Sequence, residues 1–115
     1  MVTKEFIAHI LELLEGHCSA NARRMFGGHG LFRDGLMFAI VADETLYLKV
    51  DAGNLKDFTG RGLQPFTYQR QNKPTALSYY RAPDECLDEP EAMISWADNA
   101  YAAALRTTRK KRLKG

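Results

Sequence analysis

The chain has 115 residues, of which 45% are hydrophobic and 26% charged, and its formal net charge at pH 7 is +2. This length and mixture are typical of one soluble globular domain that can bury a core without help from metals or disulfides. No apolar run approaches the ~20 residues of a membrane-spanning helix and the N-terminal residues lack a signal-peptide pattern, so we expect a cytoplasmic protein without membrane association.

The first predicted element is an amphipathic helix of about 12 residues near the N-terminus. Its apolar residues Phe6, Ile10 and Leu14 recur at helical spacing, which places them on one side. Thr3 is suited to cap the first turn, and Gly16 is suited to end the helix.

Three strand-like segments follow, at residues 25–33, 36–41 and 46–50. Asp34 and Gly35 between the first two predict a tight hairpin turn, because this pair tolerates the backbone angles of a type I′ turn. Residues 36–41 are almost wholly apolar, which indicates a central strand. The sequence therefore predicts an antiparallel meander.

A second helix and two further strands are predicted next. Residues 52–60 read as a short helix, with Asp51 as its N-cap and Gly60 at its end. Residues 64–70 and 76–82 read as two strands connected through a short polar turn.

The last predicted element is a long helix over residues 88–112, with Pro90 in its first turn. Its apolar stripe consists of Met93, Trp96, Ala97, Ala100, Ala103 and Ala104. Small alanines allow close approach, so the stripe predicts packing against a sheet or against a partner helix.

Together these elements predict an α+β fold in the order helix, three-stranded antiparallel meander, helix, two strands, C-terminal helix. The expected architecture is a five-stranded antiparallel sheet with the helices on one face. Residues 1–105 are predicted to form this single domain, and residues 106–115 a flexible basic tail.

The predicted tail contains six basic residues and no acid, which leaves ten basic against all 14 acidic residues in the rest of the chain. These candidate nucleic-acid-binding residues are Arg106, Arg109, Lys110, Lys111, Arg112 and Lys114. Such a cluster can contact phosphates without regard to base sequence. The alternative is a solubilising end without a partner, and no nucleic-acid-binding motif accompanies the cluster.

The segment "GGHG" is the most unusual stretch in the chain. It lacks the spacing of phosphate-binding loops and leads into hairpin sequence rather than into a helix, which argues against an anion site. We therefore expect Gly27, Gly28 and Gly30 to permit a bend or close backbone contact. Met25 and Phe26 are expected to anchor the sheet to a helix.

No catalytic or metal-binding constellation is recognisable. His9, His17 and His29 occur without a metal-ligand motif, so no metal or cofactor site is predicted. Cys18 and Cys86 are far apart in the sequence and read as reduced thiols that pack as small apolar side chains. We expect a protein that is not an enzyme.

Several segments, taken in order, resemble the N-terminal domain of the TfoX/Sxy family of bacterial competence regulators. They are "RRMFGGHGLFRDGLMFAIVADETLYLKVD", "PFTYQ", "ALSYYRAPDECLDEPE" and "WADNAYAAA", and they extend from Arg23 to Ala104. The resemblance implies a fold like that of type III secretion chaperones, often dimeric, and a bacterial cytoplasmic protein. For full-length members it implies transcription of competence genes together with a cyclic-AMP receptor protein. The family supplies no catalytic or ligand residues to transfer.

Three functional hypotheses follow. The first is a non-enzymatic regulatory module, expected to form a homodimer and to bind an unidentified protein partner. The second is a nucleic-acid-associated accessory protein that acts through residues 106–115. A third and weaker one is a small-molecule binder or enzyme that uses the glycine-rich strand and His29.

Overall fold

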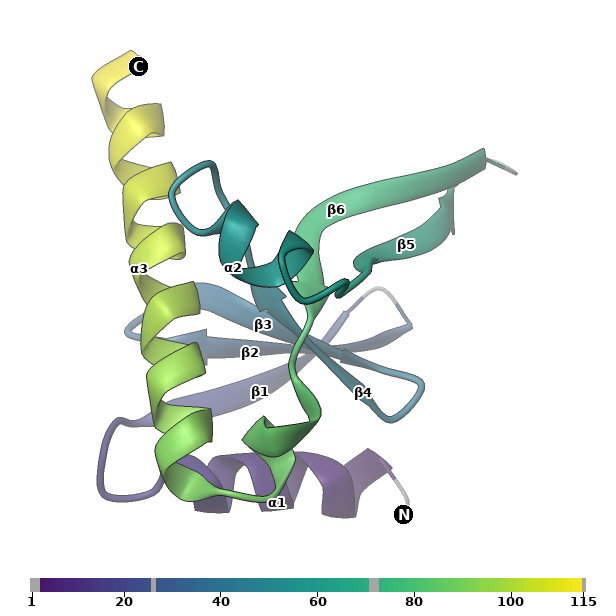
Figure 1. Cartoon of the computed structure of the whole chain (residues 1–115), viewed down its shortest axis with the longest axis vertical. Coiled ribbons are helices and arrows are strands. Elements are labelled where there is room, and N and C mark those ends of the chain that lie inside the picture. The colour runs from purple at the N-terminus through teal and green to yellow at the C-terminus, as the bar shows by residue number, and fades with distance from the viewer. Residues whose placement is uncertain (1–2, 26, 71–72, 115) are drawn as a thin grey trace.

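The structure, a computed structural model, describes residues 3–25, 27–70 and 73–114, with side chains other than those of residues 68–70, 73–77 and 111–114. Runs of consecutive strands are separated by helices along the chain, as drawn in Figure 1. Their order is α1 (Thr3–Leu14), β1 (Ala20–Met25), β2 (Gly28–Arg33), β3 (Leu36–Ala42), β4 (Thr45–Lys49), α2 (Leu55–Thr59), β5 (Pro65–Arg70), β6 (Lys73–Arg81), the 3-10 helix η1 (Asp84–Leu87) and α3 (Pro90–Lys114).

The predicted α+β class is confirmed, but the antiparallel sheet has six strands in the order β1-β2-β3-β4-β6-β5, not five. The prediction missed β1, because its sequence ANARRM has no apolar alternation and lies half-exposed at the sheet edge. The strand predicted over residues 25–33 is divided instead. Met25 ends β1 and pairs with Gly28 at the start of β2, and Gly27 between them has a φ of +72° that favours glycine.

The predicted helices are present with changed bounds. α1 has the expected 12 residues. α2 is shorter than predicted, and Asp51 does not cap it: its N-cap residue is Asn54, without a side-chain cap. The carboxylate of Asp51 instead accepts a hydrogen bond from the Gly53 N–H at 2.9 Å, within the turn that precedes α2.

The main core lies between the sheet and the helices. Buried side chains from α1, α2 and α3 pack there against those of β2, β3 and β4. The alanine stripe of α3 belongs to this core, since Ala97, Ala100 and Ala103 are at most 1% exposed. The stripe thus packs α3 within the same chain, and the predicted contact with the sheet is confirmed (Figure 1).

A smaller cluster lies on the opposite face of the sheet. Ile40, Phe66 and Tyr79 are its buried residues, and Met37 and Tyr47 pack against them. Among the described residues, this cluster draws its members from strands alone. The helices therefore cover one face of the sheet, as predicted.

A β-bulge in the pairing of β2 with β3 changes which side chains of β3 point to each face of the sheet. Leu31 pairs with Ala39 while Phe32 pairs with Met37, so Phe38 is the extra residue between them. Phe38 is buried in the main core, whereas Met37 packs on the opposite face. Without the bulge, the strict alternation of side chains along a strand would place Met37 and Ile40 on opposite faces of the sheet.

Two glycines in the "GGHG" segment serve shape, as expected. A Cβ on Gly28 would lie 2.3 Å from the carbonyl oxygen of Val41, so only glycine allows this backbone approach. A Cβ on Gly30 would lie 2.6 Å from the sulfur atoms of both Met25 and Met37. Because Met37 packs on the face away from the helices, the prediction that Met25 anchors the sheet to a helix is wrong. Phe26 lies outside the described residues.

Candidate interaction surfaces

The basic residues predicted to form a tail lie on the last turns of α3, which continues through Lys114. In Figure 1 this end of the helix extends beyond the sheet and beyond α1 and α2. Arg109 and Lys110 are exposed there, whereas the side chains of Lys111, Arg112 and Lys114 lie outside the described residues. The flexibility of residues 106–115, and their separation from a domain over 1–105, stay predictions.

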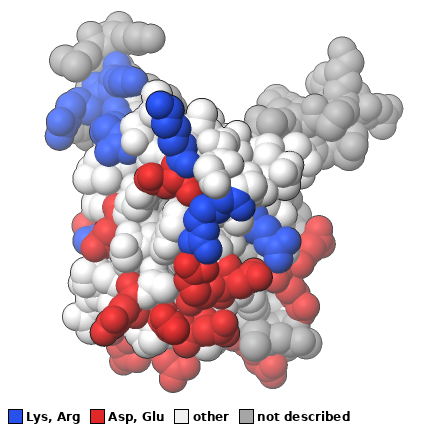
Figure 2. Space-filling view, in the orientation of Figure 1, with Lys and Arg blue, Asp and Glu red and all other residues white. Residues whose placement is uncertain are grey.

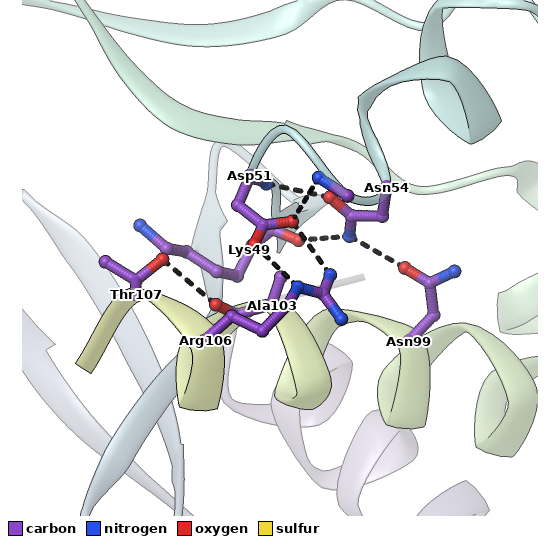
Figure 3. Close-up of polar contacts among 8 residues, drawn as sticks. Lys49, Asp51, Asn54, Asn99, Ala103, Arg106 and Thr107 are labelled. Atoms are coloured by element: carbon purple, nitrogen blue, oxygen red, sulfur yellow. Dashed lines mark hydrogen bonds and ion pairs between the residues drawn. The ribbon is translucent and has the colours of Figure 1, made fainter. Parts of the chain in front are cut away.

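Arg106 differs from the other basic residues because it faces back toward the molecule. Its Nε and one Nη donate hydrogen bonds of 2.7 and 2.8 Å to the two carboxylate oxygens of Asp51 (Figure 3). This bidentate contact lowers the pKa of Asp51, with help from the backbone N–H groups of Gly53 and Asn54. Arg106 is therefore engaged in the fold and is a weaker candidate for phosphate contact than predicted.

The loop opposite Arg106 is organised by Asn54, which is 3% exposed. Its side-chain oxygen accepts the Asp51 N–H, and its amide donates to the Lys49 carbonyl and to the Asn99 side chain at 3.0 and 2.7 Å (Figure 3). Gly53 also belongs to this contact between the loop and α3, here called the junction. A Cβ at Gly53 would lie 2.9 Å from the Arg106 guanidinium, so a larger residue would crowd it. The junction holds α3 to the connection between β4 and α2.

Charge is unevenly distributed over the face shown in Figure 2. Acidic residues gather on the half of the molecule that carries α1, η1 and the start of α3. Basic residues lie toward the other half, where α3 ends and where Lys56 of α2 is exposed. On this face the end of α3 is thus positive, and most of the acidic residues lie on the opposite half.

The second candidate surface is the sheet face opposite the helices, here called the open face. The side chains that define it are Met25, Phe32, Met37, Tyr47, Phe66 and Tyr79. The rings of Tyr47 and Phe66 are tilted by 56° to each other with centroids 4.9 Å apart, and the Tyr79 hydroxyl donates to the Met37 carbonyl at 3.2 Å. Burial raises the pKa of Tyr79 to about 12, so this hydroxyl stays protonated as the donor.

Cations accompany the aromatic rings of the open face. The Arg23 guanidinium lies 5.3 Å from the Phe32 ring centroid, and the Lys49 ammonium lies 5.1 Å from that of Tyr79. Arg23 is exposed at the edge of the sheet, and Lys49 is half-buried. The open face therefore combines apolar and positively charged groups.

The three histidines lie apart from one another. His9 bonds the Leu87 carbonyl at 2.6 Å, and His17 bonds the Asp98 carboxylate at 2.8 Å. His29 is on β2, and its Nδ1 is buried without a hydrogen-bond partner among the described atoms. In the described part of the chain, no three His, Cys, Asp or Glu side chains are grouped as metal ligands.

Asp98 receives a second partner besides His17. Arg33 donates to it at 2.8 Å, which joins β2 to α3. Burial alone would raise the pKa of Asp98, but the hydrogen bonds from His17 and Arg33 outweigh it and the pKa is lowered. The cluster links α3 to β2 and to the segment that follows α1.

The two cysteines are poorly suited to nucleophilic chemistry. Burial raises the pKa of Cys86 to about 12 and also raises the pKa of Cys18. The thiolate is the reactive form of cysteine, so both groups remain largely protonated at neutral pH. Both are free thiols, and Cys86 is buried in the main core, in line with its interpretation as a small apolar residue.

Sequence reasoning missed the open face. Its aromatic residues Phe66 and Tyr79 lie on β5 and β6, far in the sequence from the cations of the same face. Arg23 and Lys49 come from β1 and β4, and only the pairing of the strands brings them onto the same surface. The one available signal was the local spacing of Arg23 and Met25 in a segment that was not recognised as a strand.

Comparison with known proteins agrees with the expected family. The family model described as the TfoX N-terminal domain matches residues 12–104. The DNA transformation protein TfoX of Haemophilus influenzae is 35% identical over 83 residues, which are 70% of this chain and 37% of the relative. The DNA transformation protein TfoX1 of Aliivibrio fischeri is 28% identical over 80 residues, 70% of this chain and 38% of the relative. The chain thus matches little more than a third of the length of these curated relatives.

Among the described residues, no helix is both long and apolar enough to cross a membrane.

Proposed function

The chain belongs to the TfoX N-terminal domain family, and from this premise we propose that it is a non-enzymatic regulatory module that acts by binding another protein. Its similarity to proteins named for DNA transformation supports a role connected with competence. The proposal places it in the bacterial cytoplasm and links it to transcription of competence genes.

The open face is the observation that carries the proposal of a protein partner. Met25, Phe32, Met37 and Tyr47 are only half-buried there although they are large and apolar. Grouped apolar side chains bordered by charge are characteristic of protein-binding surfaces. The raised thiol pKa values support the non-enzymatic part of the proposal, since they disfavour cysteine nucleophiles.

A genetic experiment tests this function. We expect deletion of the gene to lower the frequency of transformation and the transcript levels of DNA-uptake genes in a transformable host. The wild-type chain and a Lys56→Glu control should restore both, whereas the double variant Arg23→Glu and Lys49→Glu should not. Unchanged transformation and unchanged transcripts after deletion would refute the competence role.

A second candidate function, nucleic-acid binding, is favoured by the positive end of α3. Arg109 and Lys110 are exposed on it, away from the acidic half of the molecule (Figure 2). In a gel-shift titration with duplex DNA, reversal of both charges to glutamate should reduce the salt dependence of log K by about 2. Arg106→Ala should change binding less, and Lys4→Glu at the acidic end serves as a control. Absence of DNA binding at low salt would exclude this function.

We also propose a homodimer, as expected for the family resemblance. Its motivating alanine stripe is buried within the monomer, so a second copy would have to use another surface. Sedimentation equilibrium over a range of concentrations gives the mass directly. A mass equal to one chain at every concentration would refute the dimer.

A further inference from the structure

We propose that the open face docks an acidic protein segment that inserts large apolar side chains beside Met25 and Met37. This inference rests on the proposed function and specifies the chemistry of its partner. The segment would present Asp or Glu to Arg23 and Lys49, and Phe, Leu or Trp to the thioethers. The argument depends on the packing, the charge and the accessibility of the described side chains.

The apolar part of the open face, here called the methionine floor, consists of the flexible side chains of Met25 and Met37. The sulfur atoms of Met25 and Met37 converge above Gly30, where each would lie 2.6 Å from an added Cβ. Both side chains remain half-buried, and the Phe32 ring borders them. Methionine is flexible and polarisable, so a methionine-lined surface can adjust to an inserted side chain. This floor is suited to an apolar anchor.

The charge of the strands indicates which charge the partner segment carries. None of the six strand sequences contains aspartate or glutamate. They contain seven basic residues, namely Arg23, Arg24, Arg33, Lys49, Arg70, Lys73 and Arg81. Of these, Arg23 and Lys49 lie on the open face, whereas Arg33 bonds Asp98 of α3 on the other face and Arg81 pairs with Asp84. A segment laid across the open face therefore meets Arg23 and Lys49, and charge complementarity favours an acidic one.

The cations of the open face are already positioned for such a partner. Arg23 lies against the Phe32 ring and Lys49 against the Tyr79 ring, at 5.3 and 5.1 Å from the centroids. Contact with a ring restricts a long side chain and reduces the entropy lost when it binds a carboxylate. The two cations lie on different strands, β1 and β4, and therefore border the methionine floor from two directions.

Two other occupants fit this surface less well. A second copy in a two-fold contact would place the basic open face against itself, which brings like charges together. Single-stranded nucleic acid requires accessible ring faces for base stacking. Phe66 and Tyr79 are each 6% exposed, and the Phe32 ring is in contact with Arg23. Both alternatives are tested below.

The first experiment identifies which kinds of peptide bind the protein, without assuming a partner sequence. A random peptide library displayed on phage is selected against the full chain, with the double variant Arg23→Glu and Lys49→Glu used for counter-selection. We expect enriched peptides to contain several Asp or Glu residues and at least one Phe, Leu or Trp. Enrichment of basic or uncharged peptides, or no enrichment, would overturn the proposal.

The second experiment locates binding of an enriched peptide by NMR of the protein labelled with ¹³C-methyl methionine. The signals of Met25 and Met37 should shift, while that of Met93, buried in the main core, should not. The affinity should fall by about tenfold in the Arg23→Glu and Lys49→Glu variant, as expected for two reversed charges at an interface rim, and remain unchanged in Lys56→Glu. Shifts confined to Met93, or equal affinity in all variants, would contradict the assignment.

Two controls address the other occupants. Titration with an oligo-dT strand should leave the Met25 and Met37 signals in place, and dilution of the protein alone should not move them. Shifts caused only by the oligonucleotide or only by protein concentration would assign the open face to nucleic acid or to a second copy. If deletion of the gene lowers transformation but the open-face variant complements fully, the regulatory function stands and this docking site is refuted.

Discussion

The Arg106 guanidinium binds both carboxylate oxygens of Asp51, although the two residues are 55 positions apart in the sequence. The contact joins the last part of α3 to the loop between β4 and α2 (Figure 3). It also divides the six basic residues at the C-terminal end into one that supports the fold and others farther along the helix. Arg106 should therefore affect stability, and Arg109 and Lys110 should affect surface charge.

Arg106→Ala should lower the free energy of unfolding by about 1 kcal/mol, as expected for a bidentate pair that is partly screened by solvent. The side chain of Arg106 is 41% exposed, which limits the effect, while that of Asp51 is only 13% exposed. Urea denaturation of both chains measures the difference. Arg109→Ala is the matched control, and an equal loss in the two variants would contradict a specific role for Arg106.

The pair also predicts a dependence of stability on pH. The hydrogen bonds from Arg106 lower the pKa of Asp51 in the folded chain. A carboxylate with a lowered folded pKa contributes stability above its unfolded pKa of about 4, and that contribution is lost as pH falls through the folded value. The stability difference between wild type and Arg106→Ala should therefore narrow below about pH 4, as measured by urea denaturation across that range. A difference that stays constant in acid would refute this linkage.

Asn54→Ala should be more disruptive than Arg106→Ala. It would remove the partners of the Asp51 N–H, the Lys49 carbonyl and the Asn99 side chain at a site that is 3% exposed. Leaving buried polar groups unpaired costs about 1–3 kcal/mol. Thermal unfolding monitored by circular dichroism measures the loss, with Asn21→Ala on the exposed part of β1 as the control. Similar melting temperatures for both variants would contradict the network.

Gly28 and Gly30 should respond differently to alanine. At Gly28 the new Cβ meets the Val41 carbonyl oxygen at 2.3 Å, and backbone cannot move aside without distorting β3. At Gly30 it meets the ends of two flexible methionine side chains. We expect Gly28→Ala to cost about 2 kcal/mol or more and Gly30→Ala less than about 1 kcal/mol, by chemical denaturation. The reverse order would show that the close approach at Gly28 is not a constraint.

Local patterns predicted much of the fold. The spacing of Phe6, Ile10 and Leu14 predicted α1, and the Asp34–Gly35 pair predicted the hairpin between β2 and β3, because both signals act within a few residues. β1 has neither an apolar period nor a turn motif of its own, and its pairing with β2 is a tertiary property. A single edge strand thus escaped prediction.

The surfaces were less predictable than the elements. Six clustered cations at the end of the sequence suggested one binding tail, but the partner of Arg106 is Asp51, which only the folded chain brings near. The open face takes its side chains from all six strands and depends on the bulge at Phe38, which places Met37 on that side. These groupings of residues depend on strand register and topology, which the spacing of residues in the sequence does not reveal.

Site-specific photocrosslinking in living bacteria tests the central claim most directly. A photoreactive amino acid is placed at Met37 on the open face or at Lys56 on α2, within the full chain. We predict a discrete protein adduct from position 37 that is lost when Arg23→Glu and Lys49→Glu are added, and no such adduct from position 56. No adduct at position 37, or the same adducts from both positions, would contradict a regulatory module that binds its partner through the open face.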